Sequence, residues 1–251
     1  MPDHDPDQAS ADVTTWLRSG PPAFETVTPT APDARTGTDR LESLEVRGLQ
    51  VHLDDTDQLG GIDLDSARGQ FGVITGPVGS GKSVLLRAVL GLVPRTDGTI
   101  WWNGDEVADP ATFLIPPRAA YLPQVPRLFS ESLTDTVLLG HHPDGLADAL
   151  DRARLGDDLA AMPHGLDTTV GPKGVRLSGG QIQRTAAARA LVRHPELLVV
   201  DDLSSALDVA TESEIWDGLF AEDATELTVL AVSHRPRVLA RADQVLELRA
   251  G

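Results

Sequence analysis

The chain has 251 residues, of which 41% are hydrophobic, and this length can bury a core in one large domain or in one domain with an inserted subdomain. It contains no cysteine and has a formal net charge of -17, which excludes disulfides and thiolate metal sites and argues against nucleic acid as a partner, because phosphate-backbone binders usually carry basic patches. No uninterrupted apolar run approaches the roughly 18 residues that span a bilayer, and the acidic amino terminus is unlike a signal peptide, so we expect the chain to be soluble by itself.

Residues 1–40 are predicted to form a flexible acidic and proline-rich segment. They hold seven acidic residues and six of the 18 prolines, with one brief apolar patch around Val13, Trp16 and Leu17. Such a composition buries too little apolar surface to offset the entropy of ordering the chain. The patch around Trp16 could dock on a partner or contact the chain's own domain.

From residue 44 onward the sequence changes to short β-prone apolar segments. They predict strands at residues 44–46, 49–53, 62–64 and 71–75, followed by a helix over residues 83–92. Pro94 and an Asp97-Gly98 turn are expected to close that helix. A further strand is expected at residues 99–102.

The segment that joins the strand at 71–75 to the helix at 83–92 fits the phosphate-loop pattern G-x-x-x-x-G-K-[ST] at every fixed position. Backbone N–H groups and the positive helix end converge on an anion there, and glycines let the chain wrap closely. We expect a nucleoside triphosphate to bind to eight consecutive residues: Gly76, Pro77, Val78, Gly79, Ser80, Gly81, Lys82 and Ser83.

Two side chains of this phosphate loop have expected roles. Lys82 would reach the β and γ phosphates, and the Ser83 hydroxyl would ligate magnesium. The alternative is a glycine-rich turn with a solvated lysine. Lys82 is one of only two lysines among 21 basic residues, and this scarcity argues against that alternative.

The second half of the chain combines helical spacing with two buried strands. Apolar residues recur at helical intervals over residues 146–153 and 182–190, and continuous apolar runs follow at 197–200 and 227–232. Runs of this kind usually lie inside a parallel sheet that is covered on both faces. The predicted fold class is therefore α/β, a nucleotide-binding core with a helical insertion.

The run at 197–200 ends in two carboxylates, Asp201 and Asp202. An acidic residue at this place can sit beside the magnesium that Ser83 holds, and Asp201 is the candidate. Taken alone, the pair could equally cap the strand and start a turn. The phosphate loop upstream favours a metal ligand.

Residues 177–181 read Leu-Ser-Gly-Gly-Gln and precede a helical pattern. Ser178 can accept from the backbone three residues on and Gln181 can reach back, which is a capping box. The exposed N–H groups of this helix start form a second anion site. If the segment stood alone, a plain cap would be the favoured interpretation.

The segment does not stand alone, because six blocks occur in one order. With these blocks the chain resembles the ATP-binding cassette (ABC) ATPase family over about residues 44–248, and the Leu-Ser-Gly-Gly-Gln segment is the most specific of them. The blocks lie at residues 76–83, 121–124, 177–181, 199–202, 204–208 and 232–234.

The resemblance implies the fold in more detail. It implies a phosphate-loop NTPase (RecA-like) core with an antiparallel β subdomain and an inserted α-helical subdomain. The ABC ATPase domain would cover residues 41–251, with the core at about 41–122 and 196–251 and the helical subdomain at about 123–195.

The resemblance also implies a head-to-tail dimer in which ATP on the phosphate loop of one cassette is closed over by the other. The closing residues would be Ser178 and Gly180. They belong to the signature segment, whose expected nucleotide-binding residues are Ser178, Gly179, Gly180 and Gln181. Asp208 matches the aspartate that lines the dimer seam. The partner cassette could be a second copy or a different chain.

Further roles follow residue by residue from the family match. Gln124 matches the glutamine that touches magnesium and couples the site to a membrane partner. His234 matches the histidine that contacts the γ-phosphate, although an isolated histidine after a strand is more often structural. Together with Lys82 and Asp202, these two are the expected catalytic residues. Magnesium would be held by Ser83, Gln124 and Asp201.

Two positions depart from the family. Asp202 stands where a glutamate is usual, and losing one methylene withdraws the carboxylate from its water by roughly 1 Å, which can cost on the order of a hundredfold in rate. We therefore expect slow hydrolysis. Leu53 stands where an aromatic residue usually stacks on adenine, with His52 beside it, so either His52 substitutes or base selectivity is relaxed.

The expected function is that of an ABC transporter's ATP-binding subunit, which uses MgATP to drive a separate membrane permease from the cytoplasmic face of the membrane. Residues 121–130 look like the coupling segment, in which export-type cassettes contact transmembrane coupling helices, and residues 169–176 are similar to the loop just before the signature of such cassettes. One rival is a non-transport ABC ATPase that acts on nucleic acid or ribosomes, which the acidity and the single cassette disfavour. Another is a module in which ATP joins two chains with negligible turnover, and Asp202 keeps that possibility open.

Overall fold

A computed structural model gives the fold and describes residues 40–53, 56–203, 207, 209–220 and 226–249. The chain divides into two units, residues 1–39 and 40–251. The predicted flexible segment therefore lies, except for Arg40, outside the described residues. All the helices and strands that the structure describes belong to the second unit.

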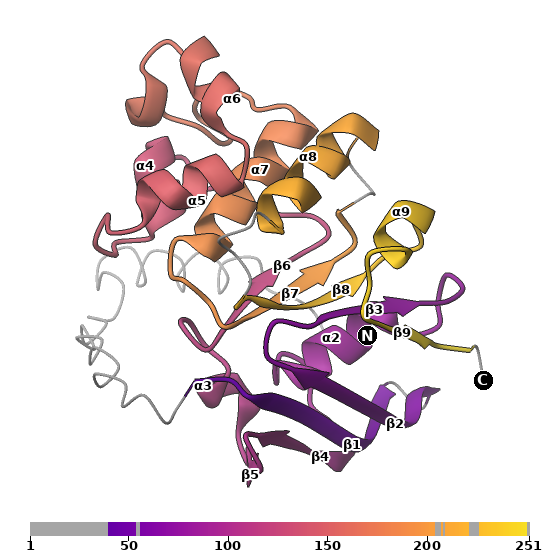
Figure 1. Cartoon of the computed structure of the whole chain (residues 1–251). Coiled ribbons are helices and arrows are strands. Elements are labelled where there is room, and N and C mark those ends of the chain that lie inside the picture. The colour runs from indigo at the N-terminus through magenta and orange to yellow at the C-terminus, as the bar shows by residue number, and fades with distance from the viewer. Residues whose placement is uncertain (1–39, 54–55, 204–206, 208, 221–225, 250–251) are drawn as a thin grey trace, which may run out of the picture. The chain divides into compact units, whose positions relative to one another are not determined.

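The central sheet of this unit is parallel, in the order β6-β7-β8-β3-β9 (Figure 1). Its strands are β3 Phe71–Thr75, β6 Ala119–Leu122, β7 Leu197–Asp201, β8 Thr228–Val232 and β9 Gln244–Glu247. Every residue of β7 and β8 is buried, as the two continuous apolar runs predict.

A second sheet is antiparallel, in the order β2-β1-β4-β5. Its strands are β1 Ser43–Leu53, β2 Thr56–Ala67, β4 Asp97–Trp102 and β5 Asp105–Glu106. The two sheets are the core and the antiparallel subdomain that the family resemblance implies.

Three boundaries in this region correct the expectations from sequence. The strands expected at 44–46 and 49–53 form one strand, because the left-handed Gly48 (φ 59°) sits in a register shift rather than in a break. The strand expected at 62–64 is the middle of the longer β2. Asp97 and Gly98 open β4 instead of forming a turn, and Gly98 packs so closely on β1 that an added Cβ would lie 2.6 Å from the Cα of Leu49.

The helices are short, apart from α7 and α8. They are α2 Lys82–Val89, α3 Pro110–Phe113, α4 Leu133–Leu138, α5 Leu146–Arg152, α6 Gly156–Ala161, α7 Gly179–Leu191, α8 Val209–Leu219 and α9 Pro236–Leu239, with a 3-10 turn at Gly165–Asp167. The helix expected over 83–92 ends at Val89, since Gly91 adopts a left-handed conformation (φ 70°).

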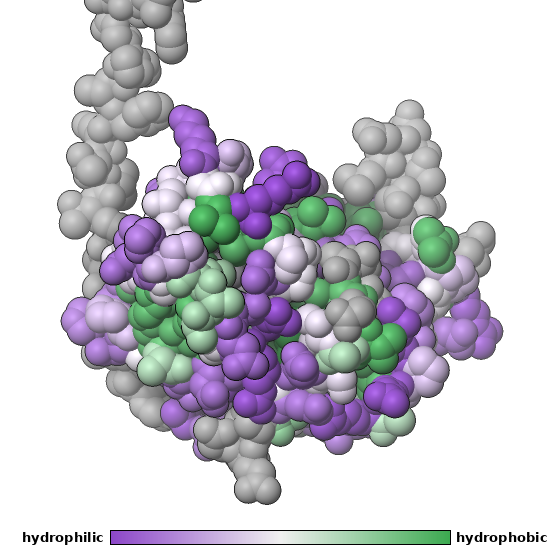
Figure 2. Space-filling view, turned by 90° about the horizontal axis from the view of Figure 1, so that it is seen from above, coloured by the Kyte–Doolittle hydropathy of each residue, from purple (hydrophilic) through white to green (hydrophobic). Residues whose placement is uncertain are grey.

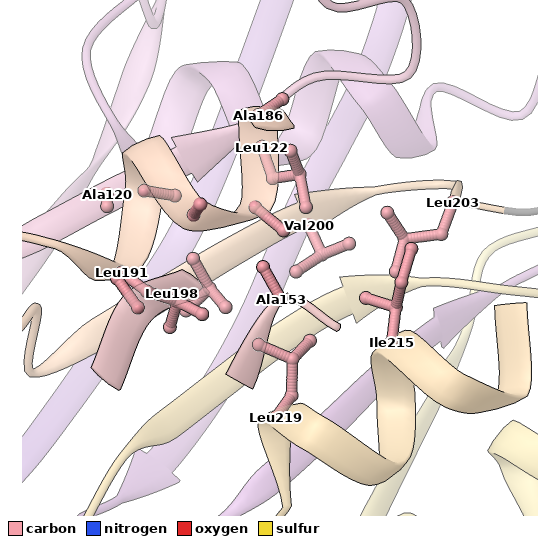
Figure 3. Close-up of a cluster of buried hydrophobic side chains, with 14 of the residues drawn as sticks. Ala120, Leu122, Ala153, Ala186, Leu191, Leu198, Val200, Leu203, Ile215 and Leu219 are labelled. Atoms are coloured by element: carbon pink, nitrogen blue, oxygen red, sulfur yellow. The ribbon is translucent and has the colours of Figure 1, made fainter. Parts of the chain in front are cut away.

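Alternate residues of the central strands face two separate cores. Leu198 and Val200 of β7 pack among buried residues of α7 and α8, such as Leu191 and Ile215 (Figure 3). The intervening residues of β7 pack instead with α2 and the antiparallel sheet. This alternation follows from the two-residue period of a strand, and it covers both faces of the parallel sheet.

The surface over the helical side mixes hydrophilic and hydrophobic residues (Figure 2). Several large apolar side chains are exposed among the described residues, including Val125, Phe129 and Leu139. All three follow β6, in or near the expected coupling segment at 121–130. Phe129 and Leu139 also line one pocket, and apolar side chains that gather on a polar surface are typical of a contact region.

Candidate functional site

The expected site residues converge on one edge of the parallel sheet. The phosphate loop follows the carboxyl end of β3, Asp201 ends β7, and His234 follows β8. Because β7, β8 and β3 are parallel neighbours, their carboxyl ends meet at the same edge. Ligands of open α/β sheets bind in this position.

The phosphate loop is shaped by glycines in conformations that disfavour a side chain. Gly76, Gly79 and Gly81 have φ values of 139°, 85° and 87°. Gly76 also lies directly against the main-chain oxygen of Leu248, where an added Cβ would overlap. The loop therefore needs glycine at its first position for both conformation and space.

The amino end of α2 is arranged as an anion site. Gly81 precedes the helix without a side-chain cap, so no side chain competes for the first N–H groups of α2. The Lys82 ammonium donates hydrogen bonds to the main-chain oxygens of Gly76 (2.9 Å) and Pro77 (2.6 Å). A cation and helix N–H groups thus face the same loop.

Two of the expected metal ligands, Asp201 and Ser83, are in direct contact. The Ser83 hydroxyl donates to Asp201 Oδ1 at 2.7 Å. The other oxygen, Oδ2, accepts from the Tyr121 hydroxyl at 3.0 Å and lies 3.6 Å from the Arg87 guanidinium. The carboxylate side chain is fully buried, so these partners set its position.

The Tyr121 hydroxyl remains a hydrogen-bond donor at neutral pH. Burial raises the pKa of Tyr121 above its usual value, while the hydrogen bond from Arg87 Nε (3.3 Å) opposes that rise. The same hydrogen bond is the main cause of the raised pKa of Arg87. A neutral phenol and a cationic guanidinium therefore both support the Asp201 carboxylate.

Asp202 directly follows the strand in a left-handed conformation with φ 45°. That conformation is uncommon for residues other than glycine, and aspartate is among those that tolerate it. The backbone turns sharply at Asp202, which is half-buried. The residue therefore stands at the carboxyl edge, next in sequence to the buried Asp201.

Gln124 and His234 lie in loops that leave the same edge. Gln124 follows β6 by two residues, and its main-chain oxygen accepts a hydrogen bond from the buried Gln183 side chain of α7 at 2.9 Å. His234 is exposed between β8 and α9. The preceding Ser233 donates its N–H to Ile74 of β3 at 3.2 Å, which ties the histidine loop to the strand before the phosphate loop.

The predicted capping box at the signature segment is confirmed. Ser178 Oγ accepts from the Gln181 N–H at 3.2 Å, and Gln181 Oε1 accepts from the Ser178 N–H at 2.9 Å, at the start of α7. Ser178 and Gly179 are exposed. Among the described residues, no hydrogen bond or ion pair joins this segment to the phosphate loop.

Two expected site positions cannot be placed. Asp208 lies outside the described residues, as do Ser204, Ser205 and Ala206 of the block at 204–208. The backbone of Leu53 ends β1, but its side chain is not described. His52, beside it, is exposed, and its N–H donates to Thr96 Oγ1 at 2.9 Å.

Sequence reasoning missed Tyr121 and Arg87 as partners of Asp201. Arg87 lies one helical turn after Ser83, a spacing that places both side chains on one face of α2. Tyr121 is the only tyrosine of the chain and lies in an otherwise apolar strand. These two features identify Tyr121 and Arg87 as partners of Asp201 only when β6 is known to pair with β7.

Comparisons with known proteins agree with the fold. A family model described as ABC transporter matches residues 59–205. The chain is 39% identical over 193 residues to the ATP-dependent lipid A-core flippase of Burkholderia orbicola, covering 76% of this chain and 32% of that protein. It is 35% identical over 231 residues to the mycobactin import ATP-binding/permease protein IrtB of Mycolicibacterium thermoresistibile, covering 89% and 39%.

A solved structure is similar over nearly the whole chain. It is that of a bacterial Atm1-family ABC exporter with ATP bound, with a TM-score of 0.76, 29% identity, and coverage of 98% of this chain and 44% of that one. The chain therefore belongs to the ABC transporter family, and its α/β phosphate-loop fold is that of the family's ATP-binding domain.

The chain spans about a third of the length of the two curated relatives described above. Within the described residues, no helix is both long and apolar enough to cross a membrane. One relative is named a flippase and the solved structure is named an exporter, which agrees with the export-type segments at 121–130 and 169–176.

Proposed function

We propose that the chain binds and hydrolyses MgATP as the ATP-binding subunit of an ABC transporter, and that it drives translocation through a separate membrane subunit from the cytoplasmic face. The observation that carries the proposal is the hydrogen bond of 2.7 Å between Ser83 of the phosphate loop and the buried Asp201. It brings two hard oxygen ligands to the loop where the triphosphate would bind.

The residues present fit magnesium. Hydroxyl, carboxylate and amide oxygens of Ser83, Asp201 and Gln124 are the donor types that Mg²⁺ prefers, and few of them are needed because substrate phosphates complete such sites. Mg²⁺ would neutralise charge on the phosphates.

The chain's own residues have separate roles in phosphoryl transfer to water. Lys82 and the N–H groups of the phosphate loop bind the β and γ phosphates and offset charge that develops on them. Asp202 accepts a hydrogen bond from the attacking water. The water oxygen bonds to the γ phosphorus as the bond from that phosphorus to the β–γ bridging oxygen breaks, so ADP and phosphate are released. His234 contacts the γ-phosphate from the loop after β8.

Closure of the site requires a second cassette. The exposed Ser178 and Gly179 at the start of α7 have no bond to the chain's own phosphate loop among the described residues, which supports a role in trans. The second cassette is either another copy or a different chain. Nucleic acid is not among the proposed partners.

A groove beside the expected coupling segment supports a membrane partner. It measures about 310 Å³ and lies between α2, α3, β6 and the α4–α7 region, lined in part by Leu92, Ile115, Tyr121, Pro123 and Leu139. Burial lowers the pKa of Arg189, which also lines it. A partly apolar groove fits the insertion of a helix from a permease.

Single-turnover hydrolysis tests the enzymatic part. Excess protein with radiolabelled MgATP should release phosphate slowly, and Lys82→Ala should abolish this release because the phosphates lose their cation. If the wild type binds ATP and associates but releases no phosphate above the Lys82→Ala level, ATP acts only to join two chains, and the hydrolase proposal is wrong.

A pull-down from detergent-solubilised membranes tests the transporter part. A protein with membrane-spanning segments should co-purify with the chain. Ile115→Glu and Leu139→Glu, which place charge in the groove, should weaken that association. Recovery of ribosomes or nucleic acid instead would contradict the proposal.

A further inference from the structure

Asp158 of α6 lies against the first turns of α7 and binds two of its side chains. One carboxylate oxygen accepts from Arg184 Nε at 2.7 Å, and the other accepts from Arg184 at 3.1 Å and from Gln181 Nε2 at 3.1 Å. The Asp158 and Arg184 side chains are each only 13% exposed. A bidentate, charge-assisted pair with little solvent has a fixed geometry.

The Arg184 guanidinium lies beneath the signature glycine. A Cβ added to Gly180 would come within 3.6 and 3.7 Å of the two terminal nitrogens of Arg184. Asp158 thus fixes the charged group that, together with the Thr211 methyl group at 3.3 Å, borders the space next to Gly180. A shift of this pair would change the packing around Gly180, which the family resemblance places against a phosphate of the second cassette.

The same carboxylate sets the orientation of the Gln181 side chain. Because Gln181 Nε2 donates to Asp158, its Oε1 faces the other way and accepts from the Ser178 N–H at 2.9 Å. A reversed amide would place two acceptors, Oε1 and the carboxylate, against each other. Asp158 therefore selects the amide orientation that closes the capping box.

The capping box in turn leaves the Ser178 hydroxyl ready to donate. Its oxygen accepts from the Gln181 N–H at 3.2 Å, and its hydrogen is donated to no other described residue. Since Ser178 is exposed, this hydrogen can point outward, toward an anion supplied by another molecule.

We propose that Asp158 is a positioning residue for the signature segment: it holds Gln181 and Arg184 so that the Ser178 hydroxyl and the Gly180 N–H face the γ-phosphate bound to a second cassette. Asp158 itself does not touch the nucleotide. The inference rests on the proposed function, because it needs a phosphate that arrives from outside the chain.

The test compares Asp158→Asn with Asp157→Asn. The first keeps the size of the side chain but removes the charge and one acceptor. The second changes an exposed neighbour on the same helix and serves as the matched control. For each variant, ATP affinity at the phosphate loop, the ATPase rate constant at saturating MgATP and the unfolding midpoint are measured.

Asp158→Asn should lower the saturated rate on the order of tenfold through misplacement of the closing groups, with ATP affinity unchanged. Asp157→Asn should match the wild type in all three measurements. Asp158→Glu, which retains the carboxylate, should recover part of the rate. If Asp158 had only a structural role, Asp158→Asn would lower the unfolding midpoint, and the ATPase rate and the ATP affinity would fall together.

Two failures are distinguishable. If the wild type shows neither hydrolysis nor nucleotide-dependent association, the proposed function fails. If the wild type hydrolyses ATP and Asp158→Asn keeps its full rate, or loses rate only in proportion to its folded fraction, the role of Asp158 fails while the proposed function stands.

Discussion

Two adjacent aspartates at the end of β7 occupy different environments. Asp201 is fully buried and held by Ser83 and Tyr121, whereas Asp202 is half-buried in a left-handed turn. A carboxylate that is fixed by hydroxyl donors suits a metal ligand. One at the edge of the site, nearer solvent, suits the orientation of water.

Asp202→Glu is expected to raise the steady-state ATPase rate, on the order of a hundredfold at most, because the longer side chain brings the carboxylate about 1 Å closer to the water. Turnover at saturating MgATP measures this. Asp202→Ala serves as the baseline. Equal rates for the wild type and Asp202→Ala would remove Asp202 from the mechanism.

Tyr121→Phe is expected to destabilise the fold by about 1 kcal/mol, because Asp201 Oδ2 loses a buried hydrogen bond. Urea denaturation measures the change. The substitution should also weaken the effect of Mg²⁺ on ATP binding, since Asp201 is held less firmly. Unchanged stability together with unchanged Mg²⁺ dependence would show that Ser83 and Arg87 position the carboxylate without Tyr121.

The sequence indicated Ser83 and Asp201 as one site because the phosphate-loop pattern is local and the acidic strand end is typical of its fold. It did not indicate Asp158. That residue acts through α6, a helix of six residues without an apolar period of its own, and its partner Arg184 is 26 positions away. Contacts of this range depend on the packing of the helices rather than on local pattern.

Gly218 sets how closely α8 packs against α5. Gly218 of α8 lies directly on the main-chain oxygen of Arg152, the last residue of α5. An added Cβ would overlap that carbonyl group. The helical region can therefore close over the sheet only with glycine at this position.

Gly218→Ala should reduce the free energy of unfolding by about 2 kcal/mol, because α5 and α8 must move apart. Gly156→Ala is the matched control, since a Cβ at this helical glycine meets nothing within 4 Å; it should be neutral or slightly stabilising. Chemical denaturation measures the free energy of unfolding of both variants. Equal stabilities would mean that α5 and α8 are not packed as described.

Element boundaries were harder to predict than element types. The strands at 71–75 and 197–200 were predicted from short apolar runs, and the helix around 182–190 was predicted from apolar residues spaced four apart. β1 was divided at Gly48 because a glycine within a strand looks like a break when its partner strand is unknown. The helices α4 and α8 were missed for a related reason: each lies between blocks that were read as motifs rather than as periodic segments.

For the molecule as a whole, nucleotide binding and folding should be linked. MgATP at about 100 times its dissociation constant should add about 2.7 kcal/mol to the stability of the wild type. Chelation of Mg²⁺ by EDTA should reduce this gain, and Asp201→Asn should show the same gain with and without Mg²⁺. Thermal or urea unfolding measures it, and a metal-independent gain in the wild type would contradict the assigned ligands.

The fold class and the family followed from six short blocks, whereas the boundary of the helical subdomain at about 123–195 stays a prediction. The transported compound could not be predicted at all, because the phosphate loop and the signature segment concern only the nucleotide. In the proposed transporter, the membrane partner would recognise that compound.

In the proposed dimer, the signature segment of one cassette closes over ATP on the other, and photo-crosslinking can detect this contact. A photoreactive amino acid at the exposed Arg176, just before the signature segment, is activated in membranes with and without MgATP, and the joined peptides are sequenced. We expect a MgATP-dependent link to a peptide with the pattern G-x-x-x-x-G-K-[ST], from a second copy or from another chain. Links that form equally without nucleotide, or that reach only peptides of other kinds, would contradict it.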